Sequence, residues 1–430
     1  MLTLRQTALD LFQQAIDRAD PAVALANALE TNPPKQTPGK TVVVALGKAA
    51  VPMMRQAMAI LEPVERALVV TNAENHTEIP GARVLAGAHP VPDEHSLNAG
   101  RAMRDAVSGL RTADRIIALI SGGGSALAVL PEPPIQLQDK AAVNAALLAS
   151  GLSINEMNLI RQHMSQLKGG GLLRLASPAQ ITSYILSDVI GDDLRAIASG
   201  PTVAPIGSRA EAKQLMHTAG IWEQLPETVR DHFNAPELGE DLPDTAQCLV
   251  GSNRHSLDAV RTGATACGFD AQVVSDTLIG DVSDAATKII EATKSAALSA
   301  EPGQKMAFIF GGETTVALNG TGKGGRNQEL ALRVARDGSD TLPGHWVFLS
   351  GGTDGRDGPT DAAGGIVDRH SWATIKKGKA DPAALLANND SYQALSRCSG
   401  LIKTGGTGTN VADVQIMLWQ ADEPTHSNPD

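Results

Sequence analysis

Short apolar runs rich in branched residues alternate with helical patterns along most of the chain. Seven such runs are strand candidates: residues 41–46, 67–70, 115–120, 181–186, 248–250, 306–310 and 346–349. Strands that alternate with helices predict parallel βαβ units. Aromatic residues make up only 3% of the chain, so the core must be Ala, Val, Leu and Ile, as buried parallel sheets require. The pattern therefore predicts a three-layer α/β architecture.

The length of the chain and its weakest patterned region predict two domains. A chain of 430 residues is too long for a single core of typical size. Prolines interrupt a mixture of acidic residues between positions 204 and 242. We place a domain junction near residue 240, which divides the chain into residues 1–240 and 241–425.

Composition argues against several classes of function. The formal net charge of -11 argues against nucleic acid or an anionic membrane as the main partner. The N-terminal residues follow a helical amphipathic pattern without an apolar export signal, and no run of 18 apolar residues occurs, so we expect a cytoplasmic protein. Cys248, Cys267 and Cys398 lie far apart without C-x-x-C spacing, which predicts reduced thiols.

The segment 350–365 is the richest in glycine and aspartate and follows a strand candidate directly. Glycine lets the backbone approach a ligand and turn its amides toward it. The carboxylates of Asp354, Asp357 and Asp361 can hold a divalent cation against phosphate oxygens. The segment suggests a phosphate-handling enzyme, with an ordinary turn-rich connection as the structural alternative.

Charged residues follow two further strand candidates, at the sheet edge where α/β folds bind ligands. Lys48 comes directly after Gly47 and the strand at 41–46, so its ammonium is expected to meet a transferring phosphoryl group there. A surface lysine at a helix start is the alternative. Asp188 comes just after the strand at 181–186.

Two glycine clusters have the spacing of anion sites. The first, the 121–125 loop, lies between a strand and a helix-like stretch, so its amides are expected to bind an anion, with a tight turn as the alternative. It consists of Ser121, Gly122, Gly123, Gly124 and Ser125.

The second cluster, the 320–325 loop, matches G-x-G-x-x-G. A lone match is weak evidence for a dinucleotide site, and no acidic residue for the ribose ends the next strand. Arg326 follows Gly324 and Gly325 at a predicted helix start, where its guanidinium suits a bidentate grip on phosphate. The chain has neither a Walker A lysine motif nor a protein-kinase H-R-D set, so a kinase activity would use another scaffold.

At these motifs the chain resembles bacterial glycerate 2-kinases of the MOFRL type, a family also named hydroxypyruvate reductase of tartrate catabolism. The shared motifs are G-K at 47–48, S-G-G-G-S at 121–125, L-S-D-V-I-G-D-D at 186–193, G-G-E-T-T at 311–315, G-G-R-N-Q-E at 324–329, the glycine-rich run at 350–364 and T-G-T-N-V at 407–411. The likeness covers nearly the whole chain. It implies a larger N-terminal Rossmann-like domain, a smaller C-terminal α/β domain and an active site in the cleft between them.

The resemblance also implies roles for individual residues. Lys48, Arg326 and Asp354 match the essential positions of the family, and Asp188 and the 121–125 loop match positions that line the cleft. Other expected contacts with substrate or nucleotide are Gly324, Gly325, Thr353 and Asn410. Asp188 and Asp354 are the candidates for holding magnesium or orienting the attacking hydroxyl. Gly406 stands where the resemblance leads us to expect a proline, which leaves the role of that loop open.

The sequence thus leads to one main hypothesis and two alternatives. The main hypothesis is ATP-dependent and Mg²⁺-dependent phosphorylation of D-glycerate to 2-phosphoglycerate by a cytoplasmic enzyme, with a homodimer left open. An NAD(P)H-dependent hydroxypyruvate reductase is the first alternative, favoured by the G-x-G-x-x-G match and the family's second name. A non-catalytic sugar-phosphate sensor is the other, and the complete set of charged residues and the lack of a DNA-binding segment count against it.

Overall fold

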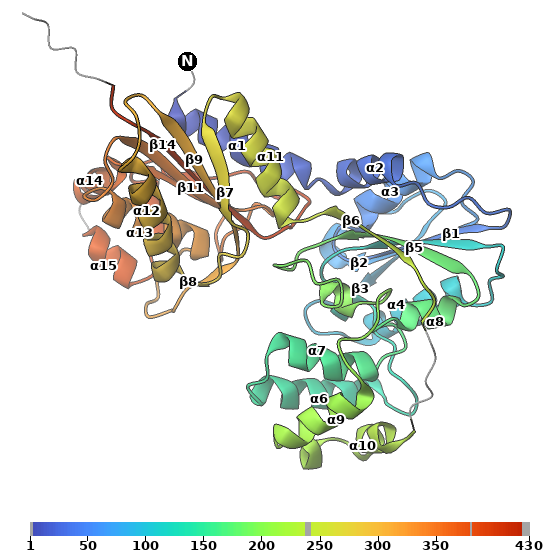
Figure 1. Ribbon diagram of the computed structural model, residues 1–430. Coiled ribbons are helices and arrows are strands. Elements are labelled where there is room, and N and C mark those ends of the chain that lie inside the picture. The colour runs from blue at the N-terminus through green and yellow to red at the C-terminus, as the bar shows by residue number, and fades with distance from the viewer. Residues whose placement is uncertain (1–2, 237–241, 379–380, 424–430) are drawn as a thin grey trace, which may run out of the picture. The chain divides into compact units, whose positions relative to one another are not determined.

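A computed structural model describes residues 3–236, 242–378 and 381–423. The chain forms two compact units, which are Pro21–Val250, here called the N-terminal unit, and Met1–Asp20 with Gly251–Asp430, here called the C-terminal unit (Figure 1). Each unit is built on a six-stranded sheet with helices against it, which confirms the predicted α/β class. No helix among the described residues combines the length and the apolar character needed to cross a membrane.

The sheet of the N-terminal unit follows the prediction of parallel strands. Its order is β3-β2-β1-β4-β5-β6, and the pairs from β3 through β5 are parallel. The strands are β1 (Thr41–Leu46), β2 (Arg66–Asn72), β3 (Arg83–Gly87), β4 (Arg115–Ile120), β5 (Gln180–Leu186) and β6 (Ala246–Gly251). Both central strands, β1 and β4, are buried along their full length, as expected of strands covered on both faces.

Helices cover both faces of this sheet and give the three layers that the sequence predicts. Figure 1 shows α2 and α3 on one face and α4 and α8 on the other. These helices are α2 (Pro21–Thr31), α3 (Ala50–Ile60), α4 (Glu94–Val107) and α8 (Gly171–Ala176), and a single turn, α5 (Gly124–Leu127), follows β4. Alternate strand residues such as Val42, Val44 and Leu46 pack into one core with Met103 of α4.

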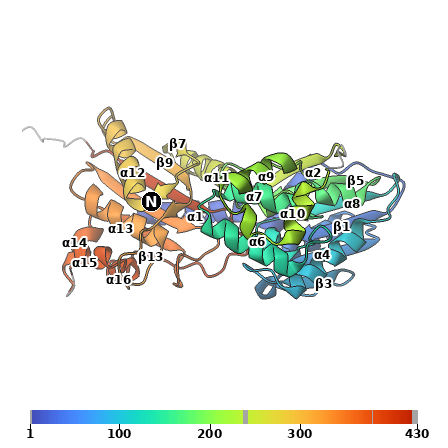
Figure 2. The same ribbon diagram turned by 90° about the horizontal axis from the view of Figure 1, so that it is seen from below.

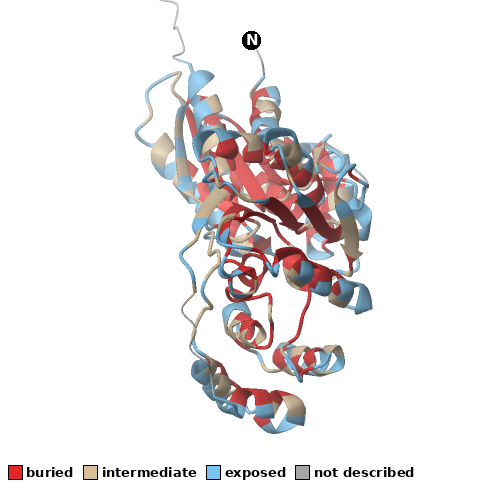
Figure 3. Cartoon of the chain, turned by 90° about the vertical axis from the view of Figure 1, so that its right-hand side faces the viewer, coloured by how far each residue is buried: buried red, intermediate tan, exposed pale blue. Residues whose placement is uncertain are grey.

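Four more helices form a bundle with a core of its own (Figures 1 and 2). They are α6 (Leu137–Ala149), α7 (Ile154–His163), α9 (Arg209–Thr218) and α10 (Glu227–Asn234). Val143, Ile160, Met216 and Phe233 are buried together in this core. Each helix exposes its other side, as the alternating colours in Figure 3 show. Three short 3₁₀ turns complete the unit: Ala73–Asn75, Ile197–Ser199 and Trp222–Gln224.

The sheet of the C-terminal unit is mostly antiparallel, so the prediction of parallel βαβ units is wrong for this half. Its order is β13-β12-β11-β14-β9-β7, and only the β7–β9 pair is parallel. The strands are β7 (Asp270–Ser275), β9 (Lys305–Gly312), β11 (His345–Gly352), β12 (Gly364–Asp368), β13 (Leu401–Ile402) and β14 (Asp413–Gln420), and β8 (Gly280–Asp281) pairs separately with β10 (Thr314–Thr315). The last strand, β14, runs between β9 and β11 and is antiparallel to both.

Strict alternation along these strands divides the core of the C-terminal unit between two helical layers. In β14, Ile416 packs with α1 (Leu4–Arg18) and α11 (Asn253–Ala266) on one face. Its neighbour Met417 packs with α12 (Val282–Ala297) and α13 (Arg326–Gly338) on the other. Three short helices complete the second layer: α14 (Ser371–Lys376), α15 (Pro382–Ala387) and α16 (Ser391–Ser396).

The first helix belongs to the C-terminal unit, which corrects the predicted division into 1–240 and 241–425. The buried side of α1 includes Leu11 and Phe12, and both join the core formed by α11 and the C-terminal sheet. The Phe12 ring lies on the backbone of Gly351 in β11, where an added Cβ would come within 2.6 Å of the ring. The N-terminal unit, Pro21–Val250, is therefore inserted in the sequence between two segments of the C-terminal unit.

All seven strand candidates lie within observed strands, namely β1, β2, β4, β5, β6, β9 and β11. The three cysteines are free thiols, as predicted.

Candidate active site

The N-terminal unit gathers Lys48, the 121–125 loop and Asp188 at one edge of its sheet. These segments follow β1, β4 and β5, which are neighbouring parallel strands, so their carboxyl ends meet. The Lys48 amide donates to the carbonyl of Gly122 at 2.9 Å. The buried Ser121 hydroxyl accepts from the Ala49 amide at 3.1 Å. The structure thus brings together these residues, as the sequence predicts.

Glycine is required at two positions of the 121–125 loop. Gly123 has a φ of +84°, a left-handed conformation that favours glycine. A Cβ at Gly122 would lie 1.8 Å from Oδ2 of Asp188, and a Cβ at Gly123 would lie 3.2 Å from Cε of Lys48. The bare backbone therefore allows a carboxylate and an ammonium to lie directly against the loop.

The helix expected after this loop is a single turn, α5, so its dipole can add little to an anion site. The amides of Gly122, Gly123 and Gly124 donate to no protein acceptor in the described ranges. Together with the neighbouring Lys48 ammonium, these loop amides can bind an anion. The prediction of an anion site therefore rests on the loop amides and Lys48, and not on a helix.

His89, which sequence reasoning missed, lies beside the same loop. Its Cδ2 would be 3.5 Å from a Cβ at Gly123, and the Lys48 side chain contacts that same position. Burial, followed by the positive charge of Lys48, lowers the pKa of His89 below its ordinary value. The lowered pKa favours the neutral imidazole, which can donate one hydrogen bond and accept another. It follows β3, which was not a strand candidate, so no motif marked it.

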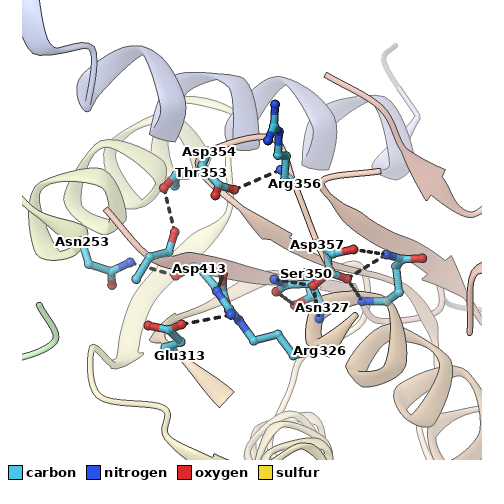
Figure 4. A network of polar contacts seen from close by, with 12 residues as sticks. Asn253, Glu313, Arg326, Asn327, Ser350, Thr353, Asp354, Arg356, Asp357 and Asp413 are labelled. Atoms are coloured by element: carbon cyan, nitrogen blue, oxygen red, sulfur yellow. Dashed lines mark hydrogen bonds and ion pairs between the residues drawn. The ribbon is translucent and has the colours of Figure 1, made fainter. Parts of the chain in front are cut away.

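In the C-terminal unit Arg326 lies between two carboxylates (Figure 4). Its Nε and Nη2 donate to Asp413 at 2.6 and 2.9 Å, and its Nη1 lies 3.0 Å from Oε1 of Glu313. The Asp413 side chain is fully buried. Burial alone would lower the pKa of Arg326, but the hydrogen bond and charge of Asp413, and then the charge of Glu313, raise it. The guanidinium is therefore permanently charged.

Asp413 occupies the bidentate edge of Arg326 that was predicted to grip phosphate. The edge is engaged because the carboxylate at the start of β14 faces the first residue of α13. Nη1 is the group that can serve a ligand, since its partner Glu313 is half exposed. Asp413 thus fixes the guanidinium, and the predicted two-oxygen grip on phosphate needs this correction.

Three further residues predicted as site residues flank two strands of the same unit. Thr353 and Asp354 follow β11 (Figure 4), and Asn410 lies shortly before β14. Thr353 is fully buried and donates to the Ala412 carbonyl at 2.7 Å, so it fixes the loop instead of facing a ligand. Asn410 accepts from the Ala412 amide at 3.1 Å. Asp354 is half-buried, and its carboxylate approaches the Gly352 backbone from the same side as that of Asp413.

The other two aspartates of the 350–365 segment have structural roles. Asp357 is buried and accepts from the amides of Asn327 and Gln328, at 3.1 and 2.8 Å, so it caps α13 from outside the helix. Burial raises the pKa of its carboxyl. Asp361 pairs with Lys403 at 2.8 Å. The three aspartates therefore do not converge on one cation.

Within the described parts of the chain no group of three or more His, Cys, Asp or Glu side chains could hold a metal ion. In kinases Mg²⁺ is usually held by one or two carboxylates together with the phosphate oxygens of the substrate. Asp354 in one unit and Asp188 in the other are half-buried carboxylates of this kind.

The 320–325 loop is held by the chain itself. Its neighbouring segment supplies acceptors for the amides of Gly320, Thr321 and Lys323, at 3.0 to 3.2 Å. Those acceptors are side-chain oxygens of residues 388–390. A Cβ at Gly324 would meet Ser391, and one at Gly325 would meet Asp357. Gly324 and Gly325 are thus explained by packing, and the preceding strand β10 has only two residues. The amides of residues 320–323 are thus engaged within the chain and are not free for the phosphates of a dinucleotide.

Comparison with known sequences assigns both halves of the chain. The sequence profile of a domain of unknown function, DUF4147, matches residues 7–234, and that of the MOFRL family matches residues 306–413. A glycerate 2-kinase of Pyrococcus horikoshii is 38% identical over 434 residues, 97% of this chain and 98% of that protein. An Agrobacterium vitis protein that carries the name of a hydroxypyruvate reductase is 39% identical over 97% of this chain and 95% of its own length.

The same relationship holds for the fold. The crystal structure of glycerate kinase from Thermotoga maritima matches with a TM-score of 0.90 at 36% identity, over 97% of this chain and 99% of that one. Identity above one third over nearly the full length, with both domains matched in order, shows common descent of the whole chain. The protein therefore belongs to the glycerate 2-kinase family that combines the DUF4147 and MOFRL domains.

Proposed function

We propose that this protein transfers the terminal phosphoryl group of ATP to the 2-hydroxyl of D-glycerate, as the names of its relatives indicate. The observation that carries the proposal is that each unit holds a cation and a carboxylate near its strand ends. Lys48 and Asp188 lie against adjacent glycines of the 121–125 loop, and Asp354 approaches Gly352 from the same side as Asp413, which holds Arg326. Phosphoryl transfer depends mainly on positioning and charge neutralisation, which such pairs supply.

The roles follow from the surroundings of each side chain. Lys48 lies against the free amides of the 121–125 loop, so it suits an anionic phosphate group. Arg326 is held rigidly by Asp413 and offers Nη1 to charge that develops on the transferring group. Asp188 and Asp354 are the candidates for orienting the attacking hydroxyl.

Magnesium, when bound, would neutralise charge on the phosphate oxygens of ATP. Asp354 and Asp188 are the residues proposed to hold it, since each is a half-buried carboxylate that follows a strand of its unit. The proposal includes ATP as the phosphoryl donor and a cytoplasmic location. It also includes a homodimer, which light scattering of the purified protein tests.

The kinase is tested against the reductase in one pair of assays. Purified protein with D-glycerate, ATP and Mg²⁺ is expected to release ADP, and phosphorus NMR is expected to show the 2-phosphate. With hydroxypyruvate and NADH no oxidation of the nicotinamide is expected, because the amides of residues 320–323 are already hydrogen-bonded. Oxidation of NADH without ADP release would reverse the assignment.

A further inference from the structure

A cavity of about 470 Å³ lies in the N-terminal unit beside the 121–125 loop. Its walls come from α6, α7 and the segments around Pro90 and Ser125. Much of the lining is apolar, but three cationic side chains enter it: Lys140, Arg161 and Lys168. We call this the cationic pocket. None of the three was a site candidate on sequence grounds.

The two lysines are almost completely buried, with Lys140 8% and Lys168 3% exposed. Charged lysines are rarely buried to this degree without a carboxylate partner. Among the described residues no Asp or Glu pairs with either lysine or with Arg161, whose Nη2 donates to the neutral amide oxygen of Asn144. The pocket lining also contains no acidic residue. Three cations thus share one cavity without an opposing charge from the described protein.

The pKa values follow the same pattern. Burial, followed by the charge of Arg161, lowers the pKa of Lys140 to about 8. Burial, followed by the charges of Lys140 and Arg161, lowers the pKa of Lys168 well below its ordinary value. Both effects oppose the charged form, so a bound anion would relieve them. Such an arrangement destabilises the unliganded fold, and perturbed groups in a cavity often mark a functional site.

A strained turn connects the pocket with the 121–125 loop. Ala198 and Ser199 have φ values of +50° and +62°, which non-glycine residues rarely adopt. The Ser199 hydroxyl lies 2.7 Å from that of Ser125, which lines the pocket. The buried Gln162 donates to the Ser199 carbonyl at 3.2 Å and holds the turn in place. Strain that the surroundings enforce in this way is typical of binding and catalytic sites.

We propose that the cationic pocket binds a multiply charged phosphate group of a ligand, with Lys140, Arg161 and Lys168 as its ligands and Ser125 at the boundary with the 121–125 loop. A single carboxylate would balance only one of three cations, whereas a phosphate monoester carries nearly two negative charges and a diphosphate more. The nucleotide and the phosphorylated product are two sources of that chemistry. This choice of ligands rests on the proposed function, but the anion site itself does not.

Ligand-induced thermal stabilisation of the full chain tests this site without turnover. The ligands are inorganic phosphate, 2-phosphoglycerate, ADP and D-glycerate, each compared with sodium chloride at equal ionic strength. We expect phosphate-bearing ligands to raise the melting temperature of the wild type. In Lys168→Met and Lys140→Met we expect their affinity to fall at least about tenfold. Loss of ADP binding alone identifies the nucleotide, and loss of 2-phosphoglycerate binding alone identifies the product.

A matched control separates binding from folding. Lys35→Met removes an exposed lysine of the same unit and should change neither melting temperature nor affinity. Without ligand, Lys168→Met should melt higher than the wild type, because it removes a buried amine whose protonation is opposed by burial and by two neighbouring cations. A lower melting temperature together with undiminished phosphate binding would overturn the proposal, as would loss of glycerate binding alone. Failure of the kinase assay with intact phosphate binding would refute only the proposed function.

Discussion

At the scale of single residues, two arginines of α13 illustrate how similar contacts serve different purposes. Arg326 and Arg333 both belong to α13, and each binds a buried carboxylate. Arg326 binds Asp413, and Arg333 binds Glu329. Arg326 also offers Nη1 beside the half-exposed Glu313, while Arg333 lies two turns along the helix. Arg326 is therefore the one of the two that we propose acts on a phosphoryl group.

We expect Arg326→Lys to lower kcat by roughly two to three orders of magnitude, as for the loss of one preorganised donor. Lysine keeps the charge but cannot hold Asp413 with two donors and still present a third. The buried carboxylate also loses a hydrogen bond, so unfolding should become about 1–3 kcal/mol easier. Steady-state kinetics and urea denaturation measure the two effects.

Arg333→Lys is the control for that substitution, because it weakens a similar ion pair to Glu329 in the same helix. It should lower stability by a comparable amount and leave kcat unchanged. If Arg333→Lys reduced kcat as strongly as Arg326→Lys, the effect at Arg326 would have to be attributed to the helix and not to catalysis.

Lys140 gives a prediction about pH. Its pKa is about 8 in the folded chain and 10.5 ordinarily, so between these values the unfolded chain holds a proton that the folded chain has lost. Raising the pH through this window therefore stabilises the fold, by up to about 3 kcal/mol from this group. Below pH 8 the charge is buried at full cost.

The variant Lys140→Met has no buried charge at this position, so it should be more stable than the wild type at pH 7. The difference in the free energy of unfolding between the two proteins should shrink toward pH 10. Denaturant midpoints of both proteins at pH 7, 8, 9 and 10 measure it, with Lys35→Met as the control. A gap that stays constant across this range would show that Lys140 does not titrate there.

At the scale of elements, the predictions from the sequence succeeded where local pattern decides the structure. The runs at 41–46 and 115–120 became β1 and β4 with the same bounds, because continuous branched apolar residues are typical of strands buried on both faces. The 121–125 loop and Lys48 lie side by side because β4 and β1 are parallel neighbours whose carboxyl ends lie at the same edge of the sheet.

Strand order and partner choice could not be predicted in the same way. β14 was not a candidate, although Val414, Ile416 and Leu418 alternate with residues of the other core. Its place between β9 and β11 depends on contacts over a long sequence separation. Lys140 and Arg161 lie within helices, where a buried cation looks like an exposed one in the sequence. Lys168 did carry a signal, since three glycines follow it directly.

The packing of α1 on β11 leads to a prediction for that element. Phe12→Ala should destabilise the C-terminal unit by about 3–5 kcal/mol, since the ring is 2% exposed and lies on the bare backbone of Gly351. Gln13 is the next residue and is exposed, so Gln13→Ala should change the free energy of unfolding by less than about 0.5 kcal/mol. Calorimetry of both variants makes the comparison; equal midpoints would mean that α1 adds little to this core.

At the scale of the whole molecule, the two units differ in how the chain builds them. The N-terminal unit is one continuous stretch, Pro21–Val250, whereas the C-terminal unit joins Met1–Asp20 to Gly251–Asp430. The described contacts of α1 with α11, β11 and β14 lie entirely within the second unit. Continuous sequence therefore defines a domain in the first case and not in the second.

We expect a fragment of residues 21–250 to fold cooperatively by itself, because its cores are formed within it. A fragment of residues 251–430 should remain poorly folded until a peptide of residues 1–20 is added, because Leu11 and Phe12 complete its core. Circular dichroism and near-ultraviolet spectra with and without the peptide test this. A cooperative melt of the second fragment alone would contradict it.

The same path of the chain sets an order of events during synthesis. α1 is made before the other described elements, but the strands that pack on its apolar side, β11 and β14, are translated only after the whole N-terminal unit. At about 5–20 residues per second, this helix must wait for tens of seconds with Leu11 and Phe12 uncovered. Throughout that interval the nascent chain exposes an amphipathic segment that a chaperone can bind. Synthesis of β14 then completes the surface on which α1 packs, so the chaperone is displaced.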